Sequence, residues 1–183
     1  MLNEILFCPL DIEIESIEFD SFIGTPVVSK YNPYWNSTLL SDEVIKKNNF
    51  DKILNQLPFD KITNIQYKIQ QKEVGPHVDV YAAMNFPNGE YEHILDTEPA
   101  GYRFVVIGKT DSLEIFNGKE YVVAALPKVP CGYILNSTSA IHRVKEDESR
   151  TTIYIRGWLN KERHLELLKR SYEKFSSYAV LKK

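Results

Sequence analysis

The stretch from Gly132 to Trp158 constrains the fold more than any other part of this chain of 183 residues. It contains an apolar segment that runs into His142, a polar turn rich in Lys, Glu and Asp, and a second apolar segment that opens with Arg150. Short apolar runs separated by a polar turn are typical of β-strands. The pattern therefore predicts two strands, one of which carries a histidine and the other an arginine.

The spacing between these two residues predicts how their side chains are oriented. Residues opposite each other in an antiparallel hairpin share a face, so a loop with an odd number of residues centred on Asp147 would put His142 and Arg150 on one face. In that register His142 pairs with Thr152, and Val144 pairs with Arg150. An arginine that points inward needs an anion, since a buried unpaired charge is very costly. A dicarboxylate co-substrate gripped by two guanidinium N–H groups would supply that anion.

A second histidine stands upstream in the segment GPHVD, residues 75–79. His77 and Asp79 are two residues apart, so on an extended strand their side chains point to the same face. Two imidazoles and one carboxylate on one face of a metal, with the other positions open, suit Fe(II) in enzymes that bind a co-substrate and O₂ there. We therefore predict an iron site made by His77, Asp79 and, from a distant strand, His142.

Less specific interpretations of the same residues stay open. A single His-x-Asp pair is a weak motif that arises by chance. A lone strand histidine is more often a core or surface residue, and an arginine at a strand end is more often solvated. Zinc hydrolysis would also use such ligands, but it gives Arg150 no purpose. The order of the residues, their common face and the Gly-Pro pair before His77 together favour the iron site.

Around these residues the chain resembles a known family. The pattern Leu-Asn-x5-His-Arg-Val at residues 135–144, with a later arginine that opens an apolar strand, is similar to the distal half of the Fe(II)/2-oxoglutarate-dependent dioxygenases. The resemblance covers about residues 65–158 and is strongest to the aspartyl/asparaginyl β-hydroxylase-like branch, which also resembles the proline hydroxylases. It implies a mainly β fold with flanking helices, the double-stranded β-helix or jelly roll of cupin-like proteins.

The same resemblance implies roles for individual residues. His77, Asp79 and His142 would be the iron ligands, and Arg150 would hold the distal carboxylate of 2-oxoglutarate. Arg103, at the start of the strand after the first ligand pair, would lie near the co-substrate or the substrate. Asp79 is present here although some β-hydroxylases lack this ligand, and residues 82–101 form a longer segment than the branch usually has.

The implied protein is an oxidoreductase: a dioxygenase that uses Fe(II), 2-oxoglutarate and O₂ to hydroxylate an amino-acid side chain, free or within a peptide or protein. One alternative is a nucleic-acid oxygenase or demethylase of the same superfamily, which should add a basic groove and base-stacking aromatics. The net charge of −3 counts against nucleic acid but leaves a local basic groove open. The other alternative is a non-catalytic metal-binding β-barrel module.

Length and composition predict one domain, residues 1–183, with a core at about 60–160 and supporting helices at 41–57 and 161–176. The N-terminal segment is acidic and has no sustained apolar stretch. We therefore expect a cytoplasmic protein with neither a signal peptide nor a membrane span. Cys8 and Cys131 give no disulfide framework. Substrate identity and oligomeric state stay open.

Hydrophobic periodicity predicts the remaining elements. Strands are expected at residues 11–15, 62–70, 103–107, 112–116 and 121–126, with a hairpin turn at Asn117-Gly118. Asn160 should cap the last helix, whose buried stripe would comprise Leu165, Leu168, Tyr172 and Phe175. Residues 85–101 form a long irregular segment, which we expect to act as a lid or to contact the substrate.

Overall fold

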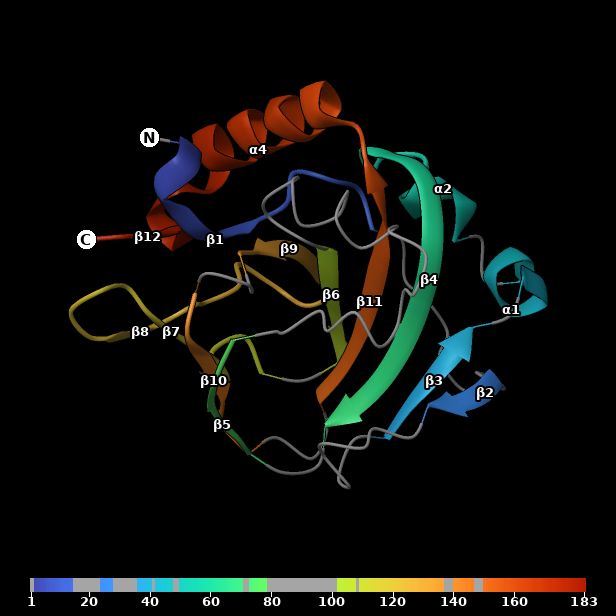
Figure 1. Ribbon diagram of the computed structural model, residues 1–183, viewed down its shortest axis with the longest axis horizontal. Helices are drawn as coiled ribbons and strands as arrows, with labels where there is room; N and C mark the ends of the chain where they lie inside the picture. Colours follow the sequence, from blue (N-terminus) through green and yellow to red (C-terminus); the bar gives the residue numbers. More distant parts are fainter. Residues whose placement is uncertain are drawn as a thin grey trace.

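The computed structural model describes residues 2–14, 24–27, 36–40, 42–47, 50–70, 73–78, 102–107, 109–136, 140–146 and 150–183. Within these residues the protein is mainly β, with antiparallel strands in two sheets and a long C-terminal helix packed against the larger one (Figure 1). The prediction of a β-rich fold with flanking helices is confirmed at this level.

The larger sheet has eight strands in the order β12-β1-β9-β6-β11-β4-β3-β2. Its strands are β1 (Ile5–Pro9), β2 (Gly24–Val27), β3 (Asn36–Leu40), β4 (Phe59–Gln70), β6 (Tyr102–Ile107), β9 (Cys131–Leu135), β11 (Arg150–Leu159) and β12 (Val180–Leu181). The smaller sheet has four strands in the order β5-β10-β7-β8, namely β5 (Val74–His77), β7 (Leu113–Phe116), β8 (Tyr121–Val123) and β10 (His142–Val144). The described helices are α1 (Asp42–Lys47), α2 (Asp51–Leu54) and α4 (Lys161–Phe175), with 3-10 turns η1 (Leu2–Glu4) and η3 (Ser176–Tyr178).

Strand β11 lies in the middle of the larger sheet and carries Arg150 at its first position. It pairs with β4 along its whole length on one side. On the other side its first half pairs with β6. Ile153 and Ile155 are fully buried, as expected for alternate residues that face one layer of the core. Gly157 lies where β4 approaches closely: a Cβ there would stand 2.2 Å from the carbonyl oxygen of Lys61. Any larger residue would therefore push the two strands apart.

Buried apolar side chains form two clusters. The first contains Ile153 and Ile155 of β11 together with Leu167 and Leu168 of α4. The second joins the two sheets, since it contains Leu113 and Ile115 of β7 as well as Tyr133 and Leu135 of β9. The candidate site described below is built beside this second cluster.

Cys8 and Cys131 are free, buried thiols. Burial raises the pKa of Cys8 to about 12, with a further contribution from Cys131, and burial raises the pKa of Cys131 to about 11. Both thiols therefore stay protonated at neutral pH and behave as small core residues.

Several predicted elements are confirmed. Strands β4, β6, β7 and β8 lie within a few residues of their predicted bounds. The Asn117-Gly118 turn forms, with the Asn117 side chain accepting hydrogen bonds from the amides of Lys119 and Glu120 and with Gly118 at a φ of 108°. Asn160 caps α4 by accepting a hydrogen bond of 3.1 Å from the amide of Arg163.

Three element predictions are wrong. The N-terminal strand is β1, and residues 11–14 form no strand, because the run Ile5–Pro9 is apolar throughout and is buried along its whole length. The helix expected at 41–57 is replaced by two short ones, α1 and α2. Leu165 is 39% exposed. Helix α4 instead buries His164, Leu167, Leu168 and Ser171, a face rotated by about one residue from the predicted one.

The hairpin predicted around Asp147 is also wrong. Strand β10 lies in the smaller sheet between β5 and β7, whereas β11 lies in the larger sheet between β4 and β6. The connection between them therefore crosses from one sheet to the other, so the register that paired His142 with Thr152 does not form. A short polar segment can connect two paired strands of one sheet or two strands of different sheets. The sequence pattern does not distinguish these cases, so the prediction was wrong.

Candidate metal and anion site

The antiparallel pairing of β5 with β10 brings His77 and His142 together from distant parts of the chain. The two residues are register partners, and their ring centroids lie 4.3 Å apart at an interplanar angle of 49°. His142 is buried at 2% exposure, whereas His77 is half-buried. The pair therefore has one side in the core and one side toward the surface.

Each imidazole is oriented by a hydrogen bond from the same ring nitrogen. Nδ1 of His77 lies 2.8 Å from the carbonyl oxygen of Gly75, and Nδ1 of His142 lies 3.0 Å from that of Ala140. A carbonyl only accepts, so Nδ1 of a neutral ring must carry the proton and Nε2 the lone pair. This arrangement is the one that histidine ligands of metals commonly show.

The spacing of the rings also fits a shared metal ion. Two imidazoles that bind one ion at ~2.1 Å and about 90° to each other would have ring centroids roughly 4.6 Å apart. The distance between His77 and His142 is 4.3 Å. The ring spacing is therefore close to the value that two such ligands would have.

The third predicted ligand, Asp79, lies outside the described residues. Among the residues that the structure does describe, no group of three or more His, Cys, Asp and Glu side chains is placed to hold a metal. Asp79 follows His77 by two positions, so a complete ligand set on this site depends on that carboxylate.

Arg150 is buried at 3% exposure at the start of β11. Its Nη1 donates to Ser112 Oγ and its Nη2 to Tyr133 Oη, both at 3.1 Å. Its Nε has no hydrogen-bond partner among the described residues. No carboxylate forms an ion pair with this guanidinium within the described part of the chain. A buried cation whose described partners are two neutral hydroxyl groups is suited to pair with an anion.

A small pocket lies beside this guanidinium. Phe7, Leu113, Ala124 and Leu126 supply apolar wall, and the polar lining comes from Arg150, Ser112, Tyr133, Lys109 and Thr110. Two of these residues are cationic and none is acidic, so the cavity favours a negatively charged guest. The ring of Phe7 packs at 5.3 Å from that of Tyr133 and supports this wall.

The metal end and the anion end are joined through β7. Ile115 is the register partner of His142, and opposite residues of an antiparallel pair share a face. Ile115 packs between the sheets, so His142 faces the same interior as Arg150. Ser112, which contacts Arg150, lies three positions before Ile115. Ser112 and Ile115 are therefore ~10 Å apart if the chain between them is extended.

Arg103 lies on β6, where its register partners are Tyr133 and Tyr154. Its backbone position is therefore on the sheet face that Tyr133 occupies, which is the face of the anion site. The side chain of Arg103 is outside the described residues, as are residues 85–101 with the predicted lid.

Ser112 and Tyr133 were not predicted from the sequence. Both carry a hydroxyl group and lie on or directly before a strand of the second core cluster, and a buried hydroxyl needs a partner. That requirement is the signal that could have identified them. Their partner, Arg150, becomes evident only when the two sheets are brought together.

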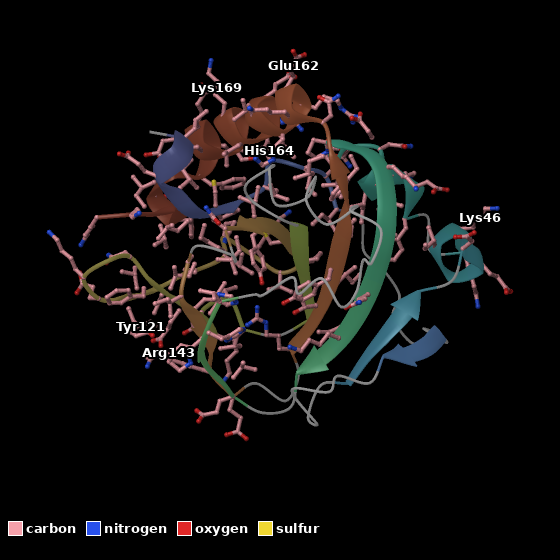
Figure 2. All side chains as sticks on the ribbon, viewed as in Figure 1. Lys46, Tyr121, Arg143, Glu162, His164 and Lys169 are labelled. Carbon is pink, nitrogen blue, oxygen red and sulfur yellow. The ribbon has the colours of Figure 1, made fainter. Side chains whose placement is uncertain are left out.

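The outer face of the smaller sheet carries a separate set of charges. Glu114, a register partner of Arg143, accepts from Arg143 and from Lys145. The guanidinium of Arg143 also lies 4.2 Å from the ring centroid of Tyr121, and Figure 2 shows these two residues together at the edge of the molecule. The hydrogen bond from Lys145, and then that from Arg143, lower the pKa of Glu114 against the opposing effect of its burial. This network ties β10 to β7 on the face opposite His142.

No protein-family model matches the chain, and no curated protein matches its sequence. Among the described residues, no helix has the length and hydrophobicity that a bilayer span requires.

Proposed function

We propose that the protein is an Fe(II)- and 2-oxoglutarate-dependent dioxygenase that hydroxylates an amino-acid side chain. Supporting this proposal is the pairing of His77 with His142, each ring held through its Nδ1. The pair faces the same inter-sheet space as Arg150, a buried arginine with no carboxylate partner among the described residues. The sequence resemblance implies roles for the same three residues, His77, His142 and Arg150.

The strand order supports a jelly roll, or double-stranded β-helix. From β4 to β7 and again from β9 to β11, successive strands alternate between the larger and the smaller sheet. Their spatial orders are β4-β11-β6-β9 and β5-β10-β7-β8. Eight antiparallel strands wound between two sheets in this way are the arrangement of that fold.

His77, Asp79 and His142 would hold the metal. Iron, when bound, supplies the reactivity toward O₂ that couples oxidative decarboxylation of 2-oxoglutarate to succinate with hydroxylation of a C–H bond. The protein's own contribution at this end is orientation. The carbonyl groups of Gly75 and Ala140 orient both rings through Nδ1, which would leave Nε2 of each ring to bind the metal.

Arg150 would bind the distal carboxylate of 2-oxoglutarate. Its Nε and the second hydrogen of Nη2 lie on the same edge of the guanidinium and offer a two-pronged contact. Tyr133 accepts from Nη2, so its own hydroxyl hydrogen can be donated to the same carboxylate. Apolar walls from Phe7, Leu113 and Leu126 exclude water from this contact and strengthen it.

A dicarboxylate of this length would have to span the two ends. Along the extended chain, Ser112, which contacts Arg150, and Ile115, the partner of His142, are ~10 Å apart. A five-carbon chain of ~5 Å, a metal–oxygen distance of ~2 Å and a hydrogen bond of ~3 Å add up to a similar span. The choice of an amino-acid side chain as substrate rests on the family resemblance, and Arg103 would be the residue nearest to it.

The test is a turnover assay with the purified protein, Fe(II), 2-oxoglutarate and O₂, in which succinate is followed by NMR. We expect succinate formation that requires both Fe(II) and 2-oxoglutarate and that rises when a suitable amino acid or peptide is added. Tyr121→Phe, on the outer face of the smaller sheet, is the matched control and should retain turnover. Failure of 2-oxoglutarate to bind in the presence of Fe(II), measured anaerobically by calorimetry, would contradict the proposal.

A further inference from the structure

We propose that the outer face of the smaller sheet is a docking surface for an acidic segment of a partner protein, bound in an extended conformation. The surface is made by side chains of β7, β8 and β10 and of the residues on either side of β10. We call it the outer patch, and it comprises Glu114, Phe116, Tyr121, Val123, Ile141, Arg143 and Lys145. These residues lie outside the candidate metal and anion site, so the inference does not depend on the proposed function.

Strand register places six of these side chains in two rows on one face. One row is Arg143, Glu114 and Val123, and the other is Ile141, Phe116 and Tyr121. Neighbours within a row belong to adjacent strands, ~4.8 Å apart. Residues between them in sequence, such as Ile115 and His142, are buried on the inner face. The outer patch is therefore one continuous surface.

The outer patch exposes apolar side chains next to one another. Val123 is 40% exposed and Ile141 is 41% exposed, the highest values among the large hydrophobic residues that the structure describes. Between them, the half-buried rings of Phe116 and Tyr121 pack with centroids 5.4 Å apart. Single exposed apolar residues are ordinary on a protein surface, but adjacent ones rimmed by polar groups are typical of an interaction site.

Arg143 is held in a defined orientation at the edge of these apolar groups. Its Nε donates to Glu114, and its guanidinium lies 4.2 Å from the ring centroid of Tyr121. These contacts use Nε and one face of the guanidinium, and they leave Nη1 and Nη2 available. A guanidinium that is already oriented loses little entropy when it donates two parallel hydrogen bonds to a carboxylate.

The hydrogen-bonding capacity that the outer patch offers to a partner is cationic. Glu114 is nearly buried, and its two oxygens accept from Arg143 and from Lys145. Lys145 is itself exposed, and Glu120 at the adjacent turn pairs with Lys183. The patch therefore presents hydrogen-bond donors and positive charge, which a partner with carboxylate groups would complement.

The spacing of the outer patch matches an extended chain. Ile141 and Arg143 are two residues apart on one face, a separation of ~7 Å. Side chains two positions apart in an extended peptide share a face and have the same separation. A carboxylate on Arg143 would therefore place the partner residue two positions away over Ile141, where an apolar side chain fits. The partner segment we infer has an acidic and an apolar residue separated by one position.

The test measures fluorescence anisotropy of a short labelled peptide in which glutamate and valine alternate at every second position, with serine between them. We expect it to bind the full chain at low ionic strength, with an affinity that falls as salt is added. A peptide with lysine in place of glutamate should not bind. Failure of the glutamate peptide to bind, or equal binding of the two peptides, would overturn the inference.

Variants locate the binding on the outer patch. Arg143→Ala should weaken the glutamate peptide by about tenfold or more, and Ile141→Thr by roughly three- to tenfold. Lys46→Ala is the matched control, since it removes the same charge from α1 on the other side of the molecule (Figure 2). Circular dichroism checks that each variant is folded. An affinity that depends on neither Arg143 nor Ile141, or that falls equally in Lys46→Ala, would contradict docking at the outer patch.

Tyr121 tests whether the orientation of Arg143 matters. Tyr121→Phe keeps the ring under the guanidinium and should bind the peptide normally, whereas Tyr121→Leu should lose about two- to fivefold in affinity. Equal affinities of these two variants would show that the ring does not prepare Arg143 for the partner. A single-stranded oligonucleotide is the alternative occupant, because it is anionic and its bases can stack on Tyr121. Tighter binding of the oligonucleotide than of the peptide at the same salt concentration would overturn the inference.

Discussion

The anion end and the metal end of the candidate site are built in different ways. Arg150 projects from a ten-residue strand in the middle of an eight-stranded sheet, and two side chains hold its guanidinium. The histidines come from strands of four and three residues in a four-stranded sheet, and one of them is half-buried. The guanidinium of Arg150 attracts an anion more strongly when it is held in place and shielded from water, because water weakens the attraction between charges. A metal ion can instead organise its own ligands as it binds.

The comparison is tested most strongly by His142→Ala. Removal of a ligand that the core holds in place should weaken binding of Mn(II) or Fe(II) by more than about 100-fold, since even loss of an outer-shell partner costs 10–100-fold. Calorimetry under anaerobic conditions measures this loss, with far-UV circular dichroism to establish that the fold is kept. An affinity within a few-fold of the unmodified protein would exclude His142 as a ligand.

Arg150→Ala tests the other end. This residue is not placed as a metal ligand, so metal affinity should be nearly unchanged. The affinity for 2-oxoglutarate should fall by about tenfold to a few hundredfold, because charge-assisted hydrogen bonds are worth about 1.5–3 kcal/mol each. Arg150→Lys should recover part of the loss, since the charge returns without the planar fork. If Arg150→Ala binds 2-oxoglutarate normally, the anion site lies elsewhere. The next candidates would be Arg103 and Arg156, the latter on β11 with the same strand parity as Arg150.

Tyr133→Phe gives a smaller effect at the same end. It removes one hydroxyl group next to the guanidinium while the ring and its packing on Phe7 remain. A hydrogen bond of about 1 kcal/mol corresponds to a loss of roughly three- to tenfold in 2-oxoglutarate affinity. The matched control is Tyr121→Phe, which should have no effect on binding. Equal losses in the two variants would mean that Tyr133 does not contact the co-substrate.

The smallest effect is expected at Glu114, which ties β10 to β7 from outside. Its pKa is lowered in the folded protein, so its ionised form stabilises the fold above the pKa of the unfolded chain. That contribution is lost as the pH falls through the lower, folded pKa. Because Arg143 and Lys145 are exposed, we expect only about 0.5–1 kcal/mol. Glu114→Gln should therefore lower stability to urea at pH 7 and remove this part of the acid dependence. Identical pH profiles of the two proteins would contradict the assignment.

The sequence was sufficient for features that depend on neighbouring residues. The cap of α4 at Asn160 and the turn at Asn117-Gly118 follow from the local chemistry of single side chains, and both form as predicted. The amphipathic face of α4 was placed about one residue away, because the prediction took Leu165 as buried and gave no weight to Ser171. Ser171 is fully buried and accepts a hydrogen bond from the amide of Asp11. Such a partner is distant in sequence and cannot be read from periodicity.

In the candidate site, too, residue types could be predicted from the sequence but the contacts between distant residues could not. His77, His142 and Arg150 were chosen by residue type and order, and the structure brings the two histidines into register. Which residues would hold Arg150 could not be predicted, because Tyr133 lies in the larger sheet and Ser112 lies directly before β7 of the smaller one. The two hydroxyl groups meet the guanidinium only after both sheets pack. The failed hairpin between β10 and β11 has the same cause, since local polarity does not determine which sheet a strand joins.

The pairing of β4 with β11 also has a consequence for how the chain folds during synthesis. Strand β4 spans Phe59–Gln70, and the partner that covers its inner edge begins only at Arg150. Pairing between strands so far apart in sequence makes folding slow, typically milliseconds to seconds. The entropy of closing a large loop is lost before the contacts that compensate for it can form. While the ribosome adds the residues between β4 and β11, the edge of β4 that later pairs with β11 stays without that partner. We therefore expect nascent chains that stop before residue 150 to aggregate or recruit chaperones, and chains extended past residue 159 to become resistant to proteolysis.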